Sequence, residues 1–288
     1  MTGTPPTPPR AASHAPGTDA GGPAGDNPTA VPGRSGAGAG RPAAAAGATG
    51  RIHSWDLSTG VDGPGTRFAL FLSGCPLRCL YCANPDTWHM RDGRTVTADD
   101  TLARIASYAG FLKAAGGGVT LTGGEPLLQA AFTARLLRGC RDLGLHTALD
   151  TSGYLGARAT DAMLADTSLV LLDIKHFDAS RYRRLTGAPL SPTLAFATRL
   201  DRLGVPVRVR YVLVPGWTDD EEGVDGLAAF AGGLSNVEQV DVLPFHKLGA
   251  RKYEELGVRF PLRDTPVPDP ALTERVREQF RAHGLRAC

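Results

Sequence analysis

The chain has 288 residues, 42% of them hydrophobic, which is enough for one large domain or two modest ones with a sizeable core. Its 31 Lys and Arg residues nearly balance its 29 Asp and Glu residues, so we expect no nucleic acid among its partners. No apolar run in the sequence is long enough to cross a bilayer, and we expect a soluble protein with no membrane partner.

The first 50 residues differ in composition from the rest of the chain. Met1–Gly50 consists mostly of Ala, Gly, Pro and small polar residues, and Val31 is its only branched aliphatic residue. Such a stretch cannot bury enough apolar surface to offset the entropy of ordering, and it lacks the apolar middle region of a secretory signal. We therefore predict a disordered tail over residues 1–50 and one folded domain over residues 51–288.

From about Arg67 onward, apolar β-rich runs alternate with helical patterns. The expected strands are Arg67–Leu72, Val119–Thr122, Leu145–Asp150, Leu169–Lys175, Val207–Val214 and Val237–Leu243. The first expected helix begins near Thr97, where Thr97-Ala-Asp-Asp100 resembles a capping box. The other expected helices are Leu127–Leu143, Arg158–Ala165, Ser180–Leu203, Asp219–Gly232 and Pro270–His283.

This alternation predicts an α/β fold of parallel strands joined by right-handed crossovers. Six such units are fewer than the eight of a closed (β/α) barrel. We therefore predict an open, partial (β/α)6 barrel, and a doubly wound open sheet is the alternative.

A short segment after the first expected strand carries three cysteines. Cys75, Cys79 and Cys82 follow a C-x3-C-x2-C spacing. Thiolates are the usual ligands of iron–sulfur clusters, and three of them leave one iron of a [4Fe–4S] cluster open to an exchangeable ligand. The alternative is a zinc site completed by His89 or another residue, but the second pair of ligands typical of zinc knuckles is not present in the sequence.

Two further cysteines stand alone in the sequence. An odd set of five cysteines does not resemble a disulfide-stapled secreted domain, and a metal site in a reducing cytoplasm fits it better. We therefore expect a cytoplasmic protein. Cys140 lies in a helical apolar pattern and is predicted to belong to the core, whereas Cys288 is the last residue and is predicted to be frayed.

An unusual segment follows each expected strand at its C-terminal end. In parallel α/β folds these loops share one face of the sheet, where sites form, so we predict that they line one cavity. Taken alone, Gly123-Gly124 also fits a strand-to-helix turn, and Asp150 also fits a helix N-cap. The segments are Cys75–Cys82, Gly123–Pro126, Asp150–Gly153, Asp173–Lys175, Arg210–Gly216 and Pro244–Lys247.

Together these motifs resemble the radical S-adenosylmethionine (SAM) superfamily. The three cysteines, the aromatic residue Tyr81 between them, and Gly123-Gly124-Glu125-Pro126 carry this resemblance. More closely, the chain resembles the glycyl-radical-enzyme activating family, of the type that activates pyruvate formate-lyase. The segments that carry this closer match are Arg51–Ser54, Val61–Gly65, Gly74–Trp88, Gly116–Gln129, His146–Gly153, Leu171–Lys175, Val209–Asp219 and Leu243–Gly249.

The resemblance implies a role for each of these loops. The amino and carboxylate groups of SAM chelate the open iron, Gly123 and Gly124 allow a close backbone approach to SAM, and Glu125 accepts a hydrogen bond near the SAM amino group. Two carboxylates beside the SAM carboxylate would repel one another unless a cation intervened. The family has a monovalent-cation site near the SAM carboxylate. The residues of this chain that match its ligands are Asp150, Thr151, Asp173 and the backbone carbonyl of Leu171.

The resemblance also implies roles for the other residues at the mouth of the expected cavity. Tyr81, Lys175, Arg210 and His246, together with Asp150 and Thr151, are implied contacts of SAM or of the substrate. Asp62 matches a position near the substrate glycine, although its Asp-Gly-Pro-Gly segment is also a good turn. Ala83 departs from the pattern, because the best-known members carry a histidine there, so the adenine contact must be weaker or made by the backbone.

The implied reaction is reductive cleavage of SAM to methionine and a 5′-deoxyadenosyl radical. This radical removes a hydrogen from the α-carbon of one glycine in pyruvate formate-lyase and leaves a glycyl radical, under the anaerobic conditions of glucose fermentation. The protein then supplies binding, orientation and exclusion of water. We expect pyruvate formate-lyase as the partner, flavodoxin or ferredoxin as the electron donor, and a monomeric enzyme.

Three alternatives stay open from the sequence. The chain could activate another glycyl radical enzyme, but many such activators carry a cysteine-rich insert, and the sequence between Ala83 and Cys140 contains no cysteine. A radical SAM enzyme that acts on a small metabolite is the second alternative. The third is a zinc-stabilised interaction domain without enzymatic activity, which would be colourless and would not cleave SAM.

Overall fold

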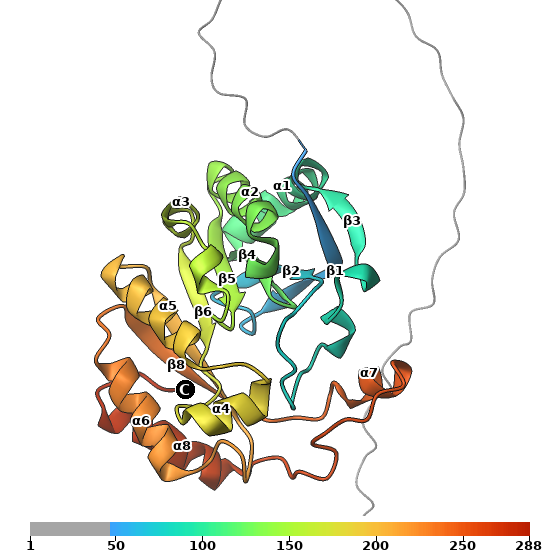
Figure 1. Ribbon diagram of the computed structural model, residues 1–288. Coiled ribbons are helices and arrows are strands. Elements are labelled where there is room, and N and C mark those ends of the chain that lie inside the picture. Colours follow the sequence, from blue (N-terminus) through green and yellow to red (C-terminus); the bar gives the residue numbers. More distant parts are fainter. Residues whose placement is uncertain (1–46) are drawn as a thin grey trace, which may run out of the picture. The chain divides into compact units, whose positions relative to one another are not determined.

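The computed structural model describes residues 47–288, which contain a single eight-stranded sheet (Figure 1). Its strands lie in the order β3-β1-β2-β4-β5-β6-β7-β8. In chain order they are β1 (Thr49–Thr59), β2 (Thr66–Leu72), β3 (Arg94–Thr97), β4 (Gly118–Gly123), β5 (His146–Thr151), β6 (Leu169–Asp173), β7 (Val207–Leu213) and β8 (Val237–Pro244).

Six of these strands form the predicted parallel series. β2, β4, β5, β6, β7 and β8 pair in chain order, each parallel to the next. The strand order never reverses, so the sheet has no topological switch point and the doubly wound alternative is wrong. Within the described residues the first and last strands of the sheet do not pair, so the sheet stays open and the predicted partial barrel is confirmed.

Two strands that the sequence analysis did not predict extend the sheet beyond β2. β1 runs antiparallel to β2, with Trp55 opposite Leu70, and β3 runs antiparallel to β1, with Ile52 opposite Arg94. β1 begins at Thr49, so the expected end of the tail at Gly50 was placed too late. Residues 1–46 of the expected tail lie outside the described residues.

Helices follow the parallel strands, as expected. The α-helices are α1 (Ala98–Ala114), α2 (Ala130–Asp142), α3 (Asp161–Ala165), α4 (Ala179–Thr186), α5 (Ser191–Arg202), α6 (Glu221–Gly232), α7 (Ala250–Glu255) and α8 (Pro270–Ala282). Short 3-10 turns are η1 (Pro85–Thr87), η2 (Met90–Asp92), η3 (Pro126–Gln129) and η4 (Gly156–Arg158). No helix within residues 47–288 combines the length and the apolar character that a membrane span requires.

The helices differ from the sequence prediction most in two places, and α2 and α3 also begin three residues later than predicted, each after a 3-10 turn. The helical pattern predicted over Ser180–Leu203 is two helices, because Gly187 ends α4 in the left-handed conformation at φ 76°. α7 was not predicted. The expected cap of α1 is confirmed, since the hydroxyl of Thr97 accepts from the N–H of Asp100 at 3.0 Å.

The core lies between the sheet and the helices. Alternate residues of β5 and β6, such as Leu149 and Leu172, join one large apolar cluster with the helices, and Cys140 belongs to it at 1% exposure, as predicted. The residues between them form a small separate cluster of Ala148, Leu169 and Leu171 on the inner face of the sheet. Side chains alternate along a strand, so Asp150 and Asp173 continue this inner face at the C-terminal ends.

The C-terminal residues cover the edge of β8. Ala287 forms a parallel bridge with Val240, and the N–H of Cys288 donates to the carbonyl of Val240 at 3.1 Å. The carbonyl of Cys288 in turn accepts from the N–H of Val242 at 2.9 Å. The prediction that Cys288 is frayed was therefore wrong, because pairing with an otherwise open strand edge fixes it.

Candidate active site

A cavity of about 420 Å³ lies at the C-terminal ends of the parallel strands. The loops after β2, β4, β5, β6 and β8 and the end of β7 all contribute to its wall, as predicted. Of the predicted site residues, Asp62 and Leu171 do not line it. Those that do are Cys75, Cys79, Tyr81, Cys82, Gly123, Gly124, Glu125, Asp150, Thr151, Asp173, Lys175, Arg210 and His246.

Main-chain hydrogen bonds hold the cysteine loop to two neighbouring segments. The N–H of Cys75 donates to the carbonyl of Trp88 at 3.0 Å, and the N–H of Arg78 donates to the carbonyl of Thr186 at the end of α4 at 2.8 Å. The guanidinium of Arg78 lies 5.0 Å from the centre of the Trp88 ring. The loop therefore has a fixed course along the cavity wall.

The chemistry of the three thiols fits an iron–sulfur cluster. Burial is the main cause that raises the pKa of Cys75 and Cys79 to about 12, and the nearby Glu125 carboxylate contributes to the shift of Cys75. Burial also raises the pKa of Cys82, against the opposing effect of two donors, the Asn84 N–H and the Trp88 indole. A bound metal reverses this balance, because a coordinating thiol loses its proton. Three soft sulfur ligands on one short loop suit a cluster with one open iron.

The structure does not support a zinc site formed by the three cysteines and His89. His89 is exposed and does not line the cavity. Within residues 47–288, no three His, Cys, Asp or Glu side chains, the three cysteines included, converge as the ligands of a single metal ion would, whereas the three cysteine ligands of a [4Fe–4S] cluster bind three different irons.

Gly123 and Gly124 allow the end of β4 to pack closely on its neighbours. Gly123 has φ 107°, and a Cβ there would lie 2.4 Å from the backbone nitrogen of Leu72. A Cβ on Gly124 would lie 2.3 Å from the carbonyl oxygen of Gly74, just before the first cysteine. The Gly-Gly pair is therefore required by the fold itself, as the strand-to-helix turn interpretation anticipated.

Glu125 joins the loops after β4 and β5. One carboxylate oxygen accepts from the Thr151 hydroxyl at 2.6 Å and the Leu127 N–H at 3.2 Å. The other accepts from the N–H and the hydroxyl of Ser152 at 3.0 and 2.5 Å. The four acceptor positions of the carboxylate are thus taken within the protein, and burial nevertheless raises the pKa of Glu125. The sequence analysis did not identify Ser152 as the partner of this carboxylate.

Two ion pairs lie side by side on the inner face. Arg210 lies 2.9 Å from Asp150, which also accepts from the Thr122 hydroxyl at 2.7 Å. Lys175 lies 2.9 Å from Asp173. Each carboxylate therefore already has a cationic partner in the protein.

The surroundings of Arg210 and Lys175 strongly favour the charged forms of both side chains. The Asp150 carboxylate raises the pKa of Arg210 above its ordinary value. Burial opposes the charge of Lys175, but Asp173 and the neighbouring Tyr81 and Cys79 outweigh it, and the pKa of Lys175 lies well above its ordinary value. The ammonium of Lys175 also lies 5.6 Å from the centre of the Tyr81 ring.

Asp62 belongs to the loop between β1 and β2. Its carboxylate accepts from the Ser58 hydroxyl at 2.6 Å, and its carbonyl accepts from the Thr120 hydroxyl at 2.6 Å. Val61, the preceding residue, lines the cavity and is 68% exposed. Asp62 is thus next to the cavity rim, although it does not line the cavity.

The loop after β8 reaches the other side of the cavity. His246 lines the cavity, is exposed, and accepts from the N–H of Leu248 at 3.3 Å. A Cβ on Gly249 would lie 3.0 Å from the Cα of Ala83, so this loop packs against the position where the sequence departs from the family pattern.

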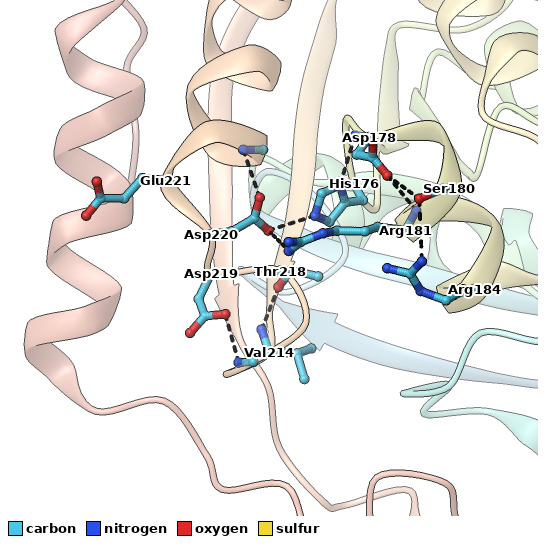
Figure 2. A network of polar contacts seen from close by, with 12 residues as sticks. His176, Asp178, Ser180, Arg181, Arg184, Val214, Thr218, Asp219, Asp220 and Glu221 are labelled. Carbon is cyan, nitrogen blue, oxygen red and sulfur yellow. Dashed lines mark hydrogen bonds and ion pairs between the residues drawn. The ribbon is translucent and has the colours of Figure 1, made fainter.

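A further polar network, which the sequence analysis missed, ties the loop after β6 to the start of α6 (Figure 2). His176 is fully buried, and its Nδ1 accepts from the N–H of Asp178 at 2.9 Å, so its Nε2–H donates to Asp220 at 2.9 Å. Arg181 lies 2.6 Å from the same carboxylate. The network fixes the segment that follows Lys175.

Comparisons with known proteins identify the family of this chain. Residues 70–227 match the family model described as the radical SAM superfamily. A pyruvate formate-lyase-activating enzyme of Staphylococcus aureus (strain USA300) is 43% identical over 239 residues, which cover 81% of this chain and 94% of that protein.

Solved structures show the same fold. A domain of the pyruvate-formate lyase-activating enzyme from Bacteroides vulgatus ATCC 8482 has a TM-score of 0.51 and 25% identity, covering 60% of this chain and 98% of that one. A radical SAM methyltransferase from Sphaerobacter thermophilus has a TM-score of 0.56 and 19% identity, covering 81% of this chain and 71% of that one. The second likeness concerns the fold alone.

Proposed function

We infer the function from the family, because the chain belongs to the radical SAM superfamily and, within it, to the family of the pyruvate formate-lyase-activating enzymes. We propose that it removes a hydrogen atom from the α-carbon of one glycine in a pyruvate formate-lyase and leaves a glycyl radical there. The observation that carries this proposal is one cavity, lined by three cysteines of a single loop and by segments from the C-terminal end of every parallel strand.

The three thiolates of Cys75, Cys79 and Cys82 would hold a [4Fe–4S] cluster, and SAM would occupy the cavity beside it. The chemistry that the cluster and SAM supply together is reductive cleavage of SAM to methionine and a 5′-deoxyadenosyl radical. The electron would come from reduced flavodoxin or ferredoxin.

The charged side chains of the inner face would bind the charged groups of SAM. Arg210 and Lys175 keep their positive charge in the cavity wall and are each anchored by a carboxylate, so their positions are set before SAM arrives. The backbone of Gly123 and Gly124 offers a surface without side chains next to the cysteine loop.

Apolar side chains would keep water away from the radical. Leu77, Val212 and Phe245 line the same cavity as the cysteines. Exclusion of water prevents side reactions of a strong hydrogen-abstracting agent. The protein's contribution is then binding, orientation and protection, with no acid–base pair needed.

Asp62 and His246 would contact the partner's glycine loop at the cavity rim. Val61 and His246 bring the loops after β1 and β8 to the cavity, and both are exposed. Glycine has no side chain to hinder close approach, and the radical left on it is delocalised over the flanking amide and carbonyl groups. We propose that Asp62 orients the backbone of this loop.

A monovalent cation would bind near Asp150, Thr151, Asp173 and the carbonyl of Leu171. Asp150 pairs in register with Leu171, which places the proposed ligands on adjacent strands. The cation would share the Asp150 and Asp173 carboxylates with Arg210 and Lys175. We further propose that the enzyme is a cytoplasmic monomer that works under anaerobic conditions.

Anaerobic reconstitution tests the cluster and SAM cleavage. The protein should become brown, bind about four irons and four sulfides per chain, and release 5′-deoxyadenosine from SAM under reducing conditions. Cys79→Ala should lose both properties, whereas Cys288→Ser, a matched change outside the cavity, should keep both. One equivalent of zinc, with no visible absorbance and no SAM cleavage, would overturn the proposal.

A further inference from the structure

The outer side of the cysteine loop lies at the protein surface. Its three cysteines line the cavity, whereas Pro76 and Arg78, which lie between them in the sequence, are exposed to solvent. A single stretch of chain therefore reaches both the cavity and the solvent. Because electron transfer slows steeply with distance, this loop offers a short route for an electron into a cluster held by the three cysteines.

The last turn of α4 packs directly against this loop. Besides the bond from the N–H of Arg78 described above, the N–H of Leu80 donates to the carbonyl of Leu185 at 2.9 Å. Leu185 is fully buried, whereas Arg183 and Arg184, in the same turn of the helix, are exposed. The two arginines thus lie on the surface, next to the part of α4 that holds the cysteine loop.

These two segments carry positive charge and no negative charge. Residues 73–83 and 179–190 contain four arginines and neither aspartate nor glutamate. Only Arg181 of the four forms an ion pair within residues 47–288, with Asp220. Arginine near the C-terminal end of a helix also stabilises the helix itself, but Arg78 lies outside any helix. Arg78, Arg183 and Arg184 therefore form a cationic surface beside the cysteine loop.

Arg78 is held in place on the loop. Its guanidinium donates to the carbonyls of Cys75 and Leu77 at 2.7 and 2.8 Å, and it lies 5.0 Å from the centre of the Trp88 ring. A guanidinium has five N–H donors, so further donors remain for a partner. A side chain that is already ordered loses little entropy on binding, and a guanidinium matches carboxylates in shape and charge. The surface is thus prepared for a partner that carries carboxylates.

We propose that Arg78, Arg183 and Arg184 form the docking surface for the electron donor, and that this donor is a small one-electron carrier protein with an acidic face. The inference rests on the proposed function, since it needs a cluster on the three cysteines. In the docked state one electron passes from the reduced carrier, which is oxidised, to the cluster, which is reduced, and no covalent bond forms or breaks. Complementary charges mainly speed the encounter, which suits a carrier that must leave after each electron.

Arg183→Gln/Arg184→Gln removes two of the three charges and leaves the main-chain contacts of the cysteine loop in place. Stopped-flow experiments use the reconstituted enzyme, with reduced flavodoxin as the acidic carrier. At low ionic strength, the second-order rate constant of cluster reduction should fall about tenfold in the variant. In about 1 M salt, where the Debye length is about 3 Å, the variant and the wild type should differ little.

Photoreduced 5-deazariboflavin, a small neutral reductant, separates docking from the rest of the reaction. SAM cleavage driven by this reductant should be the same in the variant and in the wild type, because a neutral molecule needs no charged docking surface. Slower cleavage in the variant would show that the two arginines act through the fold of the loop, and it would overturn the proposal.

Lys113→Gln/Arg202→Gln is the matched control. Both residues are exposed in the last turns of their helices, α1 and α5, which precede β4 and β7 and therefore end at the edge of the sheet opposite the cavity. The control removes the same total charge and should keep the wild-type rate with flavodoxin. Equal slowing in the control would assign the effect to net charge and would overturn the docking surface.

The outcomes also distinguish this proposal from the proposed function. A wild-type chain that takes up no cluster, or that does not cleave SAM with 5-deazariboflavin, contradicts the proposed function. If the wild type cleaves SAM with the neutral reductant, two results overturn the docking surface alone. One is a flavodoxin reaction that is unchanged in Arg183→Gln/Arg184→Gln, and the other is a wild-type cluster that flavodoxin does not reduce.

Discussion

At the scale of single residues, a partly buried histidine at the start of β5 is expected to make the stability of the protein depend on pH. Burial, together with the nearby charges of Arg67 and Arg208, lowers the pKa of His146 to about 4. Arg67 lies 3.1 Å from Nδ1 of His146, and a guanidinium only donates, so this nitrogen must accept and carry no proton. The folded protein therefore favours neutral His146.

This shift predicts an acid-sensitive stability. Between pH 6.5 and about 4 the unfolded chain binds a proton at His146 that the folded chain does not bind, so folded-state stability is lost as the pH falls through this window. The free energy of unfolding, measured by urea titration at pH 7 and pH 5, should fall more for the wild type than for His146→Gln. Equal losses in the two proteins would contradict the assignment.

The local spacing of residues explains which parts of the site could be predicted. The predicted cluster ligands Cys75, Cys79 and Cys82 lie within eight positions of one another, so the sequence alone is enough to identify them. The hydrogen bonds from Thr151 and Ser152 to Glu125 depend on segments far apart in the chain, and no periodicity marks them. Cys288 was misjudged for the same reason, because its partner is a distant strand edge.

At the scale of secondary-structure elements, the two antiparallel strands β1 and β3 were the main omission. β1 has few fully buried residues and β3 has none, so neither shows the apolar run by which the parallel strands were identified. β4 and β6, in contrast, are buried along almost their whole length. Strands with helices on one face and the barrel interior on the other have continuous apolar sequences, whereas antiparallel strands that are partly exposed do not.

The position at which β1 begins predicts how much of the N-terminal segment can be deleted without loss of stability. Thr49 and Gly50 pair with Thr97 and Val96 of β3, and the carbonyl of Ala48 accepts from the N–H of Ala98 at 2.8 Å. Deletion of residues 1–46 should keep the Tm and SAM cleavage, whereas deletion of residues 1–50 should lower the Tm by several degrees. Differential scanning calorimetry of both truncations checks this, and the same Tm for the two would show that the pairing contributes nothing.

The loop that carries Asp62 gives a prediction that separates SAM cleavage from partner activation. The buried hydroxyl of Thr120 donates to the carbonyl of Asp62 and accepts from Nε of Arg67 at 3.0 Å, so it anchors this loop to β4. Thr120→Val should lower the rate of glycyl radical formation about tenfold, the equivalent of about 1.4 kcal/mol, while SAM cleavage without the partner continues.

Thr120→Ser is the control for this loop, because it keeps the hydroxyl. It should retain most of the glycyl radical formation that the valine variant loses. A parallel decline of SAM cleavage and radical formation in Thr120→Val would assign the residue to the cluster and SAM part of the site instead.

At the scale of the whole molecule, the six parallel strands lie in chain order, and the loops at their C-terminal ends therefore share one face of the sheet. The sequence predicted this arrangement because six strand–helix units in succession allow few topologies once crossovers are right-handed. The number of strand–helix units predicted that the sheet is open, since six parallel strands do not close into a barrel of the kind that eight form. Cofactor identity required the motif resemblance and the family comparison, since the fold alone hosts many chemistries.

The most direct test of the central claim is transfer of the glycine α-hydrogen. The reconstituted chain is mixed anaerobically with SAM, a reductant and a pyruvate formate-lyase deuterated at the α-carbon of its glycines. We predict deuterium in the 5′-deoxyadenosine that is released and a glycyl radical signal on the partner by electron paramagnetic resonance. SAM cleavage without either the deuterium transfer or the glycyl signal would contradict the account and assign the chain to radical SAM enzymes of another kind.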